Sequence, residues 1–125
     1  MANYERSRLL VFILVLIIVP LIAEADVADV LGRYVGYTIV ASKTIAGYVD
    51  KDGTRKNQFD GCNFGRTIIF DDNTSMTCST YGYQYAFRPT AIILMKSMSI
   101  GGKSYGSVVM VVESDSYDMQ GVILN

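Results

Sequence analysis

The sequence predicts an all-β domain: a small barrel, SH3-like or OB-like, of five to six strands with one disulfide. Three observations predict it. Short runs rich in β-branched and aromatic residues recur every 8–14 residues or so, roughly the spacing typical of small β domains. Turn-forming pairs such as Asp72-Asn73 and Gly101-Gly102 separate these runs. The chain has two cysteines, Cys62 and Cys78. A two-sheet sandwich is the alternative architecture.

The N-terminus has the three parts of a secretory signal peptide in their usual order. Arg6 and Arg8 precede an unbroken apolar run over residues 9–19, which ends at Pro20. Ala23-Glu24-Ala25 follows, in which two small residues flank one other residue, the pattern of a signal-peptide cleavage site. We therefore expect export, to the periplasm or out of the cell.

Residues 1–25 are thus predicted to be removed, which leaves one β domain over residues 26–125. An uncleaved anchor extended through Leu21 and Ile22 is the alternative, but about 20 apolar residues are needed to span a bilayer. The whole chain has 11 basic and 12 acidic residues, and the predicted signal peptide contains two of each. The mature chain therefore keeps 9 basic and 10 acidic residues. This near-neutral balance argues against a nucleic acid partner and against stable membrane binding after cleavage.

The first half of the mature chain combines one helical stretch, one long strand and a loop. Residues 26–34 are predicted to form one or two helical turns. Residues 35–49 are rich in β-branched residues and predict one long strand, bent near Ser42 or Gly47. Residues 50–60 are polar and predict a loop.

A hairpin follows the loop. Residues 66–70 and 75–78 predict its two strands, and Asp72-Asn73 predicts a two-residue turn, because Asp and Asn favour turns. In that register Cys78 would face Thr67.

The two cysteines then constrain the chain before the hairpin. A straight strand would carry Cys62 about 16 Å beyond the position facing Cys78, whereas a disulfide requires Cα atoms about 4.4–6.8 Å apart. We expect the disulfide, because two cysteines in an exported chain are typically bonded. Residues 61–65 must therefore fold back, and their two glycines allow it. Two free thiols are the alternative.

The rest of the chain predicts further strands separated by glycine, proline and serine. Gly101-Gly102 and Ser114-Asp115-Ser116 are expected turns, and Pro89 is expected to mark a bend or an edge. The expected strands lie over residues 81–88, 91–98, 107–113 and, as a short final strand, 117–119.

An alternating aromatic pattern lies within the first of these strands. Tyr81, Tyr83, Tyr85 and Phe87 are spaced by two, so an extended chain places all four on one face. We favour burial of this face, with Phe87 the most buried and at least one Tyr hydroxyl at the surface. The alternative is a set of exposed rings that stack on a sugar or a peptide.

Arg88 follows the aromatic pattern, and it could bind the carboxylate of a ligand. We favour a local Asp or backbone carbonyls as its partner. The candidate ligand-contacting residues are Tyr81, Tyr83, Tyr85 and Arg88.

Several classes of chemistry are excluded or disfavoured. The chain has no histidine, which excludes Ser-His triads and histidine metal sites. Asp50-Lys51-Asp52-Gly53 resembles the start of a calcium loop, but the closing Glu is absent, so an ordinary turn is favoured. No phosphate-binding glycine loop is present. No catalytic residue, metal or cofactor is expected.

Some residue pairs have a familiar pattern. These motifs are Gly61-Cys62, Phe64-Gly65, Phe70-Asp71, Thr77-Cys78, the three tyrosines at 81, 83 and 85, and Arg88-Pro89. Together they resemble a group of small exported bacterial proteins without an assigned activity. The resemblance covers about residues 36–96. It implies a bacterial exported protein, and it supplies no catalytic or binding residue.

The favoured function is a non-enzymatic binding or interaction module of the periplasm or cell exterior, with a protein or a cell-wall glycan as partner. One alternative is a structural envelope protein without a small ligand. The other is a hydrolase that uses two carboxylates. Its candidate residues are Asp60, Asp71, Asp72, Glu113, Asp115 and Asp118.

Overall fold

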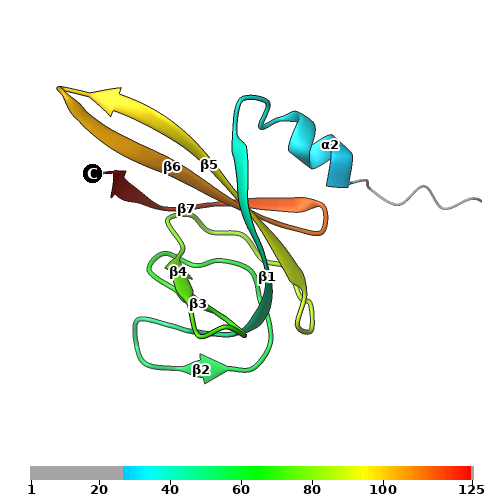
Figure 1. The fold of residues 1–125 in the computed structure, drawn as a ribbon. Coiled ribbons are helices and arrows are strands. Elements are labelled where there is room, and N and C mark those ends of the chain that lie inside the picture. Colours follow the sequence, from blue (N-terminus) through cyan, green and yellow to red (C-terminus); the bar gives the residue numbers. More distant parts are fainter. Residues whose placement is uncertain (1–26, 125) are drawn as a thin grey trace, which may run out of the picture.

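A computed structural model describes residues 27–124, and their side chains as far as residue 121, as one curled sheet with a short helix against it (Figure 1). The predicted signal peptide lies outside these residues. No helix of the described part of the chain is long and apolar enough to cross a membrane. The elements are α2 (Val27–Gly32), β1 (Thr38–Val49), β2 (Arg55–Lys56), β3 (Thr67–Phe70), β4 (Ser75–Thr77), β5 (Thr90–Ile100), β6 (Lys103–Val112) and β7 (Asp115–Leu124). The all-β prediction is confirmed.

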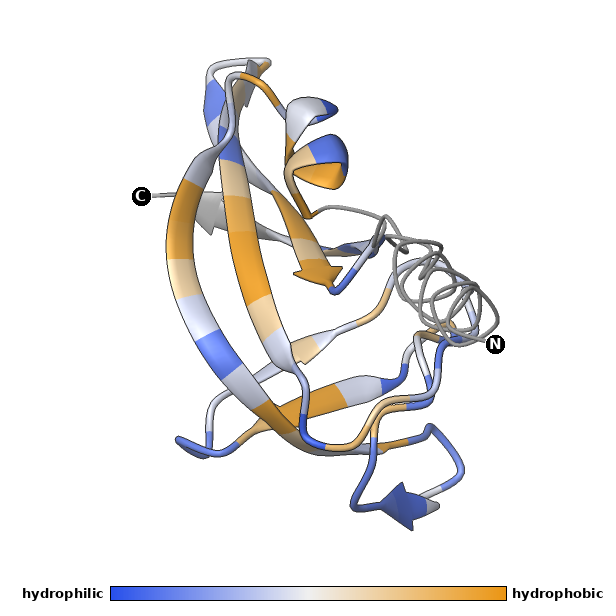
Figure 2. Ribbon diagram, turned by 90° about the vertical axis from the view of Figure 1, so that its right-hand side faces the viewer, coloured by the Kyte–Doolittle hydropathy of each residue, from blue (hydrophilic) through white to orange (hydrophobic). Residues whose placement is uncertain are grey.

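The strands follow the order β4-β3-β1-β5-β6-β7, and the short β2 adds to β1. The sheet curls until its two ends approach each other, as the bowed strands of Figure 2 show. Cys78, just after β4, forms an isolated bridge with Met119 of β7. Beside it, the Ser79 amide donates to the Asp118 carbonyl at 3.1 Å. The architecture is therefore barrel-like, with one disulfide, rather than a two-sheet sandwich.

The long bent strand that the sequence predicts is β1. Its first half pairs with β5 and its second half with β3, and the register shifts between Ile45 and Gly47. Gly47 lies where the backbone comes close to β2, since a Cβ there would lie 2.1 Å from the Lys56 carbonyl oxygen. The bend therefore lies at the predicted glycine, and it lets one strand belong to both halves of the sheet.

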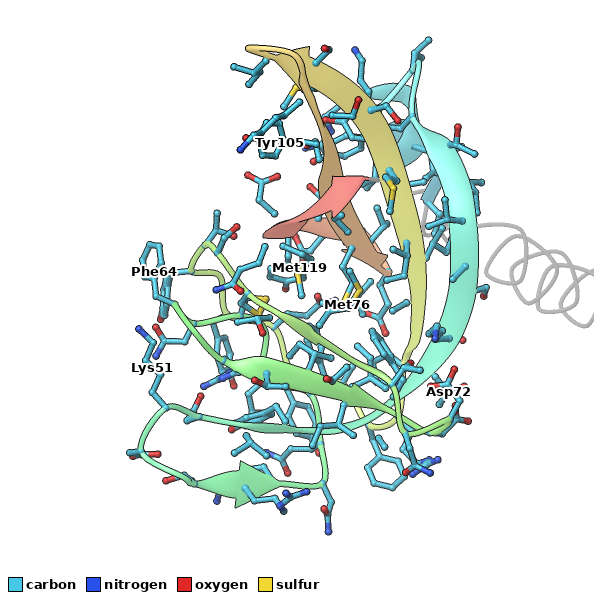
Figure 3. The ribbon with its side chains drawn as sticks, turned by 60° about the vertical axis from the view of Figure 1, so that its left-hand side comes forward. Lys51, Phe64, Asp72, Met76, Tyr105 and Met119 are labelled. Carbon is cyan, nitrogen blue, oxygen red and sulfur yellow. A yellow bond between two sulfur atoms is a disulfide. The ribbon has the colours of Figure 1, made fainter. Side chains whose placement is uncertain are left out.

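The second half of β6, residues 108–112, is buried on both faces, which explains its continuous apolar sequence. Val108, Met110 and Val112 belong to the main core. Val109 and Val111 lie on the opposite face, in a second cluster with Leu94 of β5 and Val30 of α2. Met76 of β4 and Met119 of β7 point from the two ends of the sheet into the space that it encloses (Figure 3).

The predicted register of the β3–β4 hairpin is wrong by one residue. Thr67 pairs with Thr77, and Asp71, Asp72 and Asn73 form a three-residue turn. Asn73 has φ of 64°, the left-handed conformation that such turns need and that Asn tolerates. The Cys78 amide accordingly donates to the Arg66 carbonyl, at 2.8 Å, so that Cys78 does not face Thr67.

Two other predicted boundaries change. Residues 81–88 do not form a ladder strand, because only Gly82 and Ala86 form bridges, with Cys62 and Phe59, and the chain bends at residues 87–88. The last strand is longer than predicted. It begins at Asp115, which pairs with Val112, so the turn lies at Glu113-Ser114.

Candidate functional site

The candidate site is a row of four aromatic side chains on the extended segment 81–87, here called the aromatic row. Its members are exposed to 70% (Tyr81), 72% (Tyr83), 60% (Tyr85) and 71% (Phe87). The alternation that the sequence predicts is present, but the faces are reversed. Ala86 is buried, and Gly82 and Gln84 are half-buried. The prediction that Phe87 is the most buried member is wrong.

The space beneath the segment is already filled, which is why the row turns outward. Phe59, wholly buried, and Tyr117 pack edge to face there, with ring centroids 5.7 Å apart. A Cβ added to Gly82 would lie 3.0 Å from the Tyr117 ring. The inner face therefore has little free room, and it carries Gly82, Ala86 and the half-buried Gln84. The rings buried here are therefore those of Phe59 and Tyr117 rather than those of the aromatic row.

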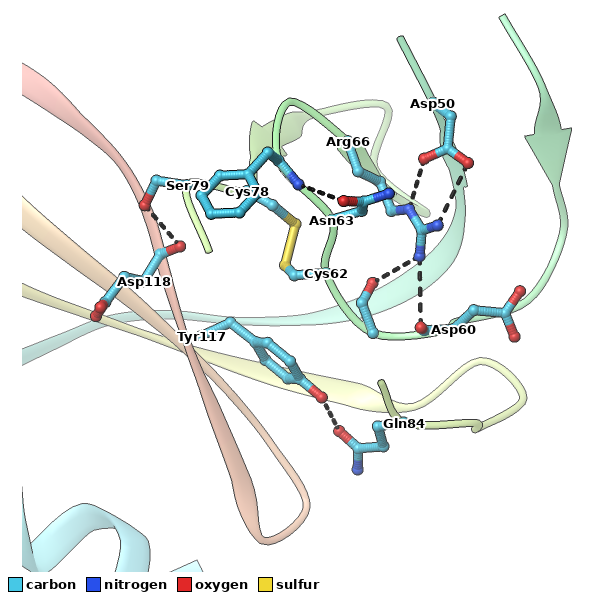
Figure 4. Close-up of a disulfide and its surroundings, with 12 residues drawn as sticks. Asp50, Asp60, Cys62, Asn63, Arg66, Cys78, Ser79, Gln84, Tyr117 and Asp118 are labelled. Carbon is cyan, nitrogen blue, oxygen red and sulfur yellow. Dashed lines mark hydrogen bonds and ion pairs between the residues drawn. A yellow bond between two sulfur atoms is a disulfide. The ribbon is translucent and has the colours of Figure 1, made fainter. Parts of the chain in front are cut away.

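Gln84 anchors the middle of the segment from below (Figure 4). The Tyr117 hydroxyl donates to Gln84 Oε1 at 2.7 Å. Gln84 Nε2 donates in turn to the Val112 carbonyl at 3.2 Å and to Glu113 Oε2 at 3.3 Å. Burial, followed by the negative charges of Asp115 and Glu113, raises the pKa of Tyr117. Tyr117 therefore remains a hydrogen-bond donor at ordinary pH.

The disulfide confirms the predicted Cys62–Cys78 pair, with a Cα–Cα distance of 5.6 Å. Residues 61–65, just before the β3–β4 hairpin, fold back as expected, with φ of 80° at Gly61 and 75° at Gly65. Gly61 is also a point of close approach, because a Cβ there would lie 1.9 Å from the Gly82 carbonyl oxygen. The fold-back thus carries residues 59–62 directly beside the segment that bears the row.

Arg66 also fixes the backbone of residues 59–62, through hydrogen bonds to its carbonyl groups. Its guanidinium binds both carboxylate oxygens of Asp50, at 2.6 and 3.3 Å, and donates to the carbonyls of Asp60 and Gly61. It also lies 3.9 Å from the centre of the Tyr48 ring. The Tyr48 hydroxyl donates to Asp60 at 2.6 Å. Burial, with this hydrogen bond second, raises the pKa of Tyr48 to about 12.

No protein-family model, curated protein or solved structure matches the chain. The geometry of the site is that of four exposed rings on a backbone fixed by a disulfide, a half-buried glutamine and an arginine.

Arg88 lies at the end of the aromatic row. It is exposed, and its φ of 44° is in the left-handed region. Within residues 27–124 it forms no ion pair or hydrogen bond, so the local partner that the sequence analysis favours is not found there. Arg88 is available to a ligand's carboxylate.

The six carboxylates proposed for a hydrolase lie in three parts of the fold. Asp71 and Asp72 lie in the β3–β4 turn, where Lys43 binds Asp72 at 2.7 Å and, with Thr74, lowers the pKa of that carboxyl. Asp60 accepts from Tyr48 and Gln58. Among residues 27–124, no three acidic or cysteine side chains gather into a group that could hold a metal. The remaining three candidates, Glu113, Asp115 and Asp118, lie in the β6–β7 turn or on β7.

The sequence analysis identified the row and the disulfide but missed the residues that support them. Phe59 is a single aromatic residue in an otherwise polar loop, and that isolation is the one signal that could have indicated burial. Tyr117 and Gln84 give no local signal, because their hydrogen bond joins residues 33 positions apart.

Proposed function

We propose that this chain is a non-enzymatic binding module, and that the aromatic row is its contact surface. The observation that carries the proposal is the exposure of all four rings, 60–72%, on a segment whose inner face is packed and hydrogen-bonded. Apolar side chains gathered on a protein surface mark interaction sites more often than single exposed ones do. A fixed backbone also lowers the entropy that binding costs, since the rings are held in place beforehand.

The chemistry of the row fits a neutral, partly polar partner. Tyr combines an apolar ring with a hydroxyl, and it suits sites that stay half-wet. In the described part of the chain, the hydroxyls of Tyr81, Tyr83 and Tyr85 have no hydrogen-bond partner, so a ligand can use them. Arg88 adds one unpaired cation at the end of the row.

The same proposal places the module outside the cytoplasm, in the periplasm or beyond the cell, in a bacterium. A structural disulfide in a small domain is typical of an oxidising compartment. The expected mature chain begins at Asp26, which is tested by intact-mass measurement of the exported protein. A product that retains residues 1–25 in the membrane fraction contradicts this part of the proposal.

The contact surface is tested by comparing three forms of the mature chain as bait: the wild type, a row variant with Ser at positions 81, 83, 85 and 87, and a control. The control replaces Val35 and Ile100 by Ser, because these side chains are 84% and 62% exposed but lie elsewhere on the surface. Each bait is incubated with an extract of exported proteins and cell-wall glycan, and bound material is identified by mass spectrometry.

A partner that the wild type and the control retain, and the row variant does not, supports the proposal. Melting temperatures of all three baits show whether loss of binding comes with loss of folding. Equal retention by wild type and row variant contradicts a role for the row, and the absence of any specific partner contradicts the binding function itself.

A further inference from the structure

We infer that the partner of the aromatic row is an extended polypeptide, which adds as a strand to the free backbone edge of residues 81–87. The inference rests on the proposed function and specifies its ligand. Its basis is the direction of backbone hydrogen bonds along the segment.

One edge of the segment is already paired. Gly82 exchanges two backbone hydrogen bonds with Cys62, at 2.8 and 3.0 Å. Ala86 exchanges two with Phe59, both at 3.0 Å. In an extended chain, the backbone groups of neighbouring residues point to opposite sides. The N–H and C=O groups of Tyr81, Tyr83 and Tyr85, which are the chain neighbours of Gly82 and Ala86, therefore point away from residues 59–62, whereas Phe87 lies in a bend.

This second edge is unpaired. Across the described residues, no hydrogen bond is formed by the backbone of Tyr81, Tyr83, Tyr85 or Phe87. Four residues of one row thus share two features: their rings are exposed, and their backbone donors and acceptors have no partner.

The segment lacks charge and proline, two of the devices that proteins use to keep other chains away, although its bridges set four residue steps, 82 to 86, against three, 59 to 62, and so include one extra residue. Free edges are typically short, or carry lysine, proline or a bulge. The outermost strand β2 follows this rule, with two residues, Arg55 and Lys56, both exposed. Residues 81–87 carry no charge and no proline, and the first of either is Arg88-Pro89 at the end of the row. An edge without charge or proline is expected where strand addition is the function.

The occupant follows from this pattern of donors and acceptors. An added strand offers alternating N–H and C=O groups at the same spacing, and it gains main-chain hydrogen bonds as in other cases of β-strand addition. The row spans about 20 Å, which matches a strand of roughly seven residues. Alternate side chains of that strand would lie beside the Tyr rings, so β-branched or aromatic residues are expected there. A sugar could stack on the rings but would leave the backbone edge unused.

The test uses two probe collections against the disulfide-bonded mature chain: a display library of random heptapeptides, and an oligosaccharide array that includes cell-wall glycan fragments. Ligands are retained only if the row variant, with Ser at positions 81, 83, 85 and 87, fails to bind them. A selected peptide is then resynthesised with one backbone amide methylated at a time.

If the peptide adds as a strand, the effect of methylation on binding should alternate from one amide of the peptide to the next. Methylation of every second amide removes a hydrogen bond to the edge and weakens binding about tenfold, while methylation of the intervening amides has little effect. Hydrogen exchange gives an independent readout. In the free protein, the amides of Gly82 and Ala86 exchange slowly and those of Tyr83 and Tyr85 fast, and the peptide slows the latter pair.

Three outcomes overturn the inference. Tyr83 and Tyr85 amides as protected as Gly82 in the free protein would mean that the edge is not free. A methylation series without periodicity, or binding by oligosaccharides alone, removes strand addition but leaves the row as the contact surface. If neither collection contains a ligand that depends on the row, the inference and the proposed function both fail.

Discussion

The meander β5–β6–β7 and the chain over residues 50–89 reach their order by different means. In the meander, β5 and β6 pair without interruption from Ala91–Val112 to Ile100–Lys103, and β7 continues the ladder. Between residues 50 and 89 the ladders are short, and much of the chain is joined by side chains instead: the disulfide, the Arg66–Asp50 ion pair and the Gln84–Tyr117 hydrogen bond. Stability is thus spread over many residues in the first region and concentrated in a few in the second.

This difference explains how an aromatic row can remain exposed. In a ladder strand, one face is normally buried and carries the large side chains. Residues 81–87 are held instead by small inward residues and by contacts from Phe59 and Tyr117, none of which belongs to the row. The row's own side chains are therefore free to bind, and the supporting residues should carry the stability.

The largest expected effect is that of Phe59→Ala. Phe59 is wholly buried beneath the segment, and removing such a side chain typically costs about 3–5 kcal/mol of unfolding free energy. Urea denaturation followed by circular dichroism measures it. Phe64→Ala is the matched control, since Phe64 is 62% exposed and lies in the same cross-linked region. A Phe59→Ala cost no larger than the control's would show that the packing beneath the segment carries little stability.

The next effect is that of removing the disulfide. Replacing Cys62 and Cys78 by Ser should cost about 2–5 kcal/mol. Hydrogen exchange should show where the loss acts: protection falls at Gly82 and Ala86 but persists along β5 and β6, whose ladder does not depend on the bridge. A uniform loss of protection would instead mean that the two regions unfold as one unit.

The same contrast separates what the sequence could predict from what it could not. The first two strands of the meander were predicted from apolar runs and the Gly101-Gly102 turn, because neighbouring strands pair and local patterns suffice, whereas β7 is longer than the predicted strand over residues 117–119. The disulfide was predicted because the chain has two cysteines. The direction of the aromatic row was not, because it depends on Tyr117 filling the space below Gly82, a contact between residues far apart in sequence. The hairpin register was missed by one residue because Asn73 takes a left-handed conformation that lengthens the turn.

Alkaline pH gives a smaller effect, specific to the cross-linked region. The pKa of Tyr48 is raised to about 12 in the folded chain, so its contribution to stability is complete below about pH 10. It is lost as the pH rises from about 10 to 12, because the unfolded chain releases this proton first. Tyr48→Phe should remove that part of the loss. The check is the urea midpoint measured from pH 8 to pH 12.

Tyr117 serves as the internal reference in that experiment, because its pKa is also raised and the substitution leaves it in place. The pH dependence of Tyr48→Phe should therefore be shallower than that of the wild type but still present. Identical pH dependence in the two proteins would contradict the environment described for Tyr48.

The smallest expected effect is on the row itself. Phe87→Ala and Tyr83→Ala remove side chains that are 71% and 72% exposed, and surface substitutions of this kind typically change stability by less than about 0.5 kcal/mol. Phe59→Ala supplies the comparison, because it removes the same ring chemistry as Phe87→Ala but from the packed side of the segment. If the two Phe substitutions differ by several kcal/mol while only Phe87→Ala weakens partner binding without loss of folding, the residues that support the segment are distinct from those that form its contact surface. Should Phe87→Ala destabilise as strongly as Phe59→Ala, the ring of Phe87 is packed in solution, and the row is part of the core rather than a surface for binding.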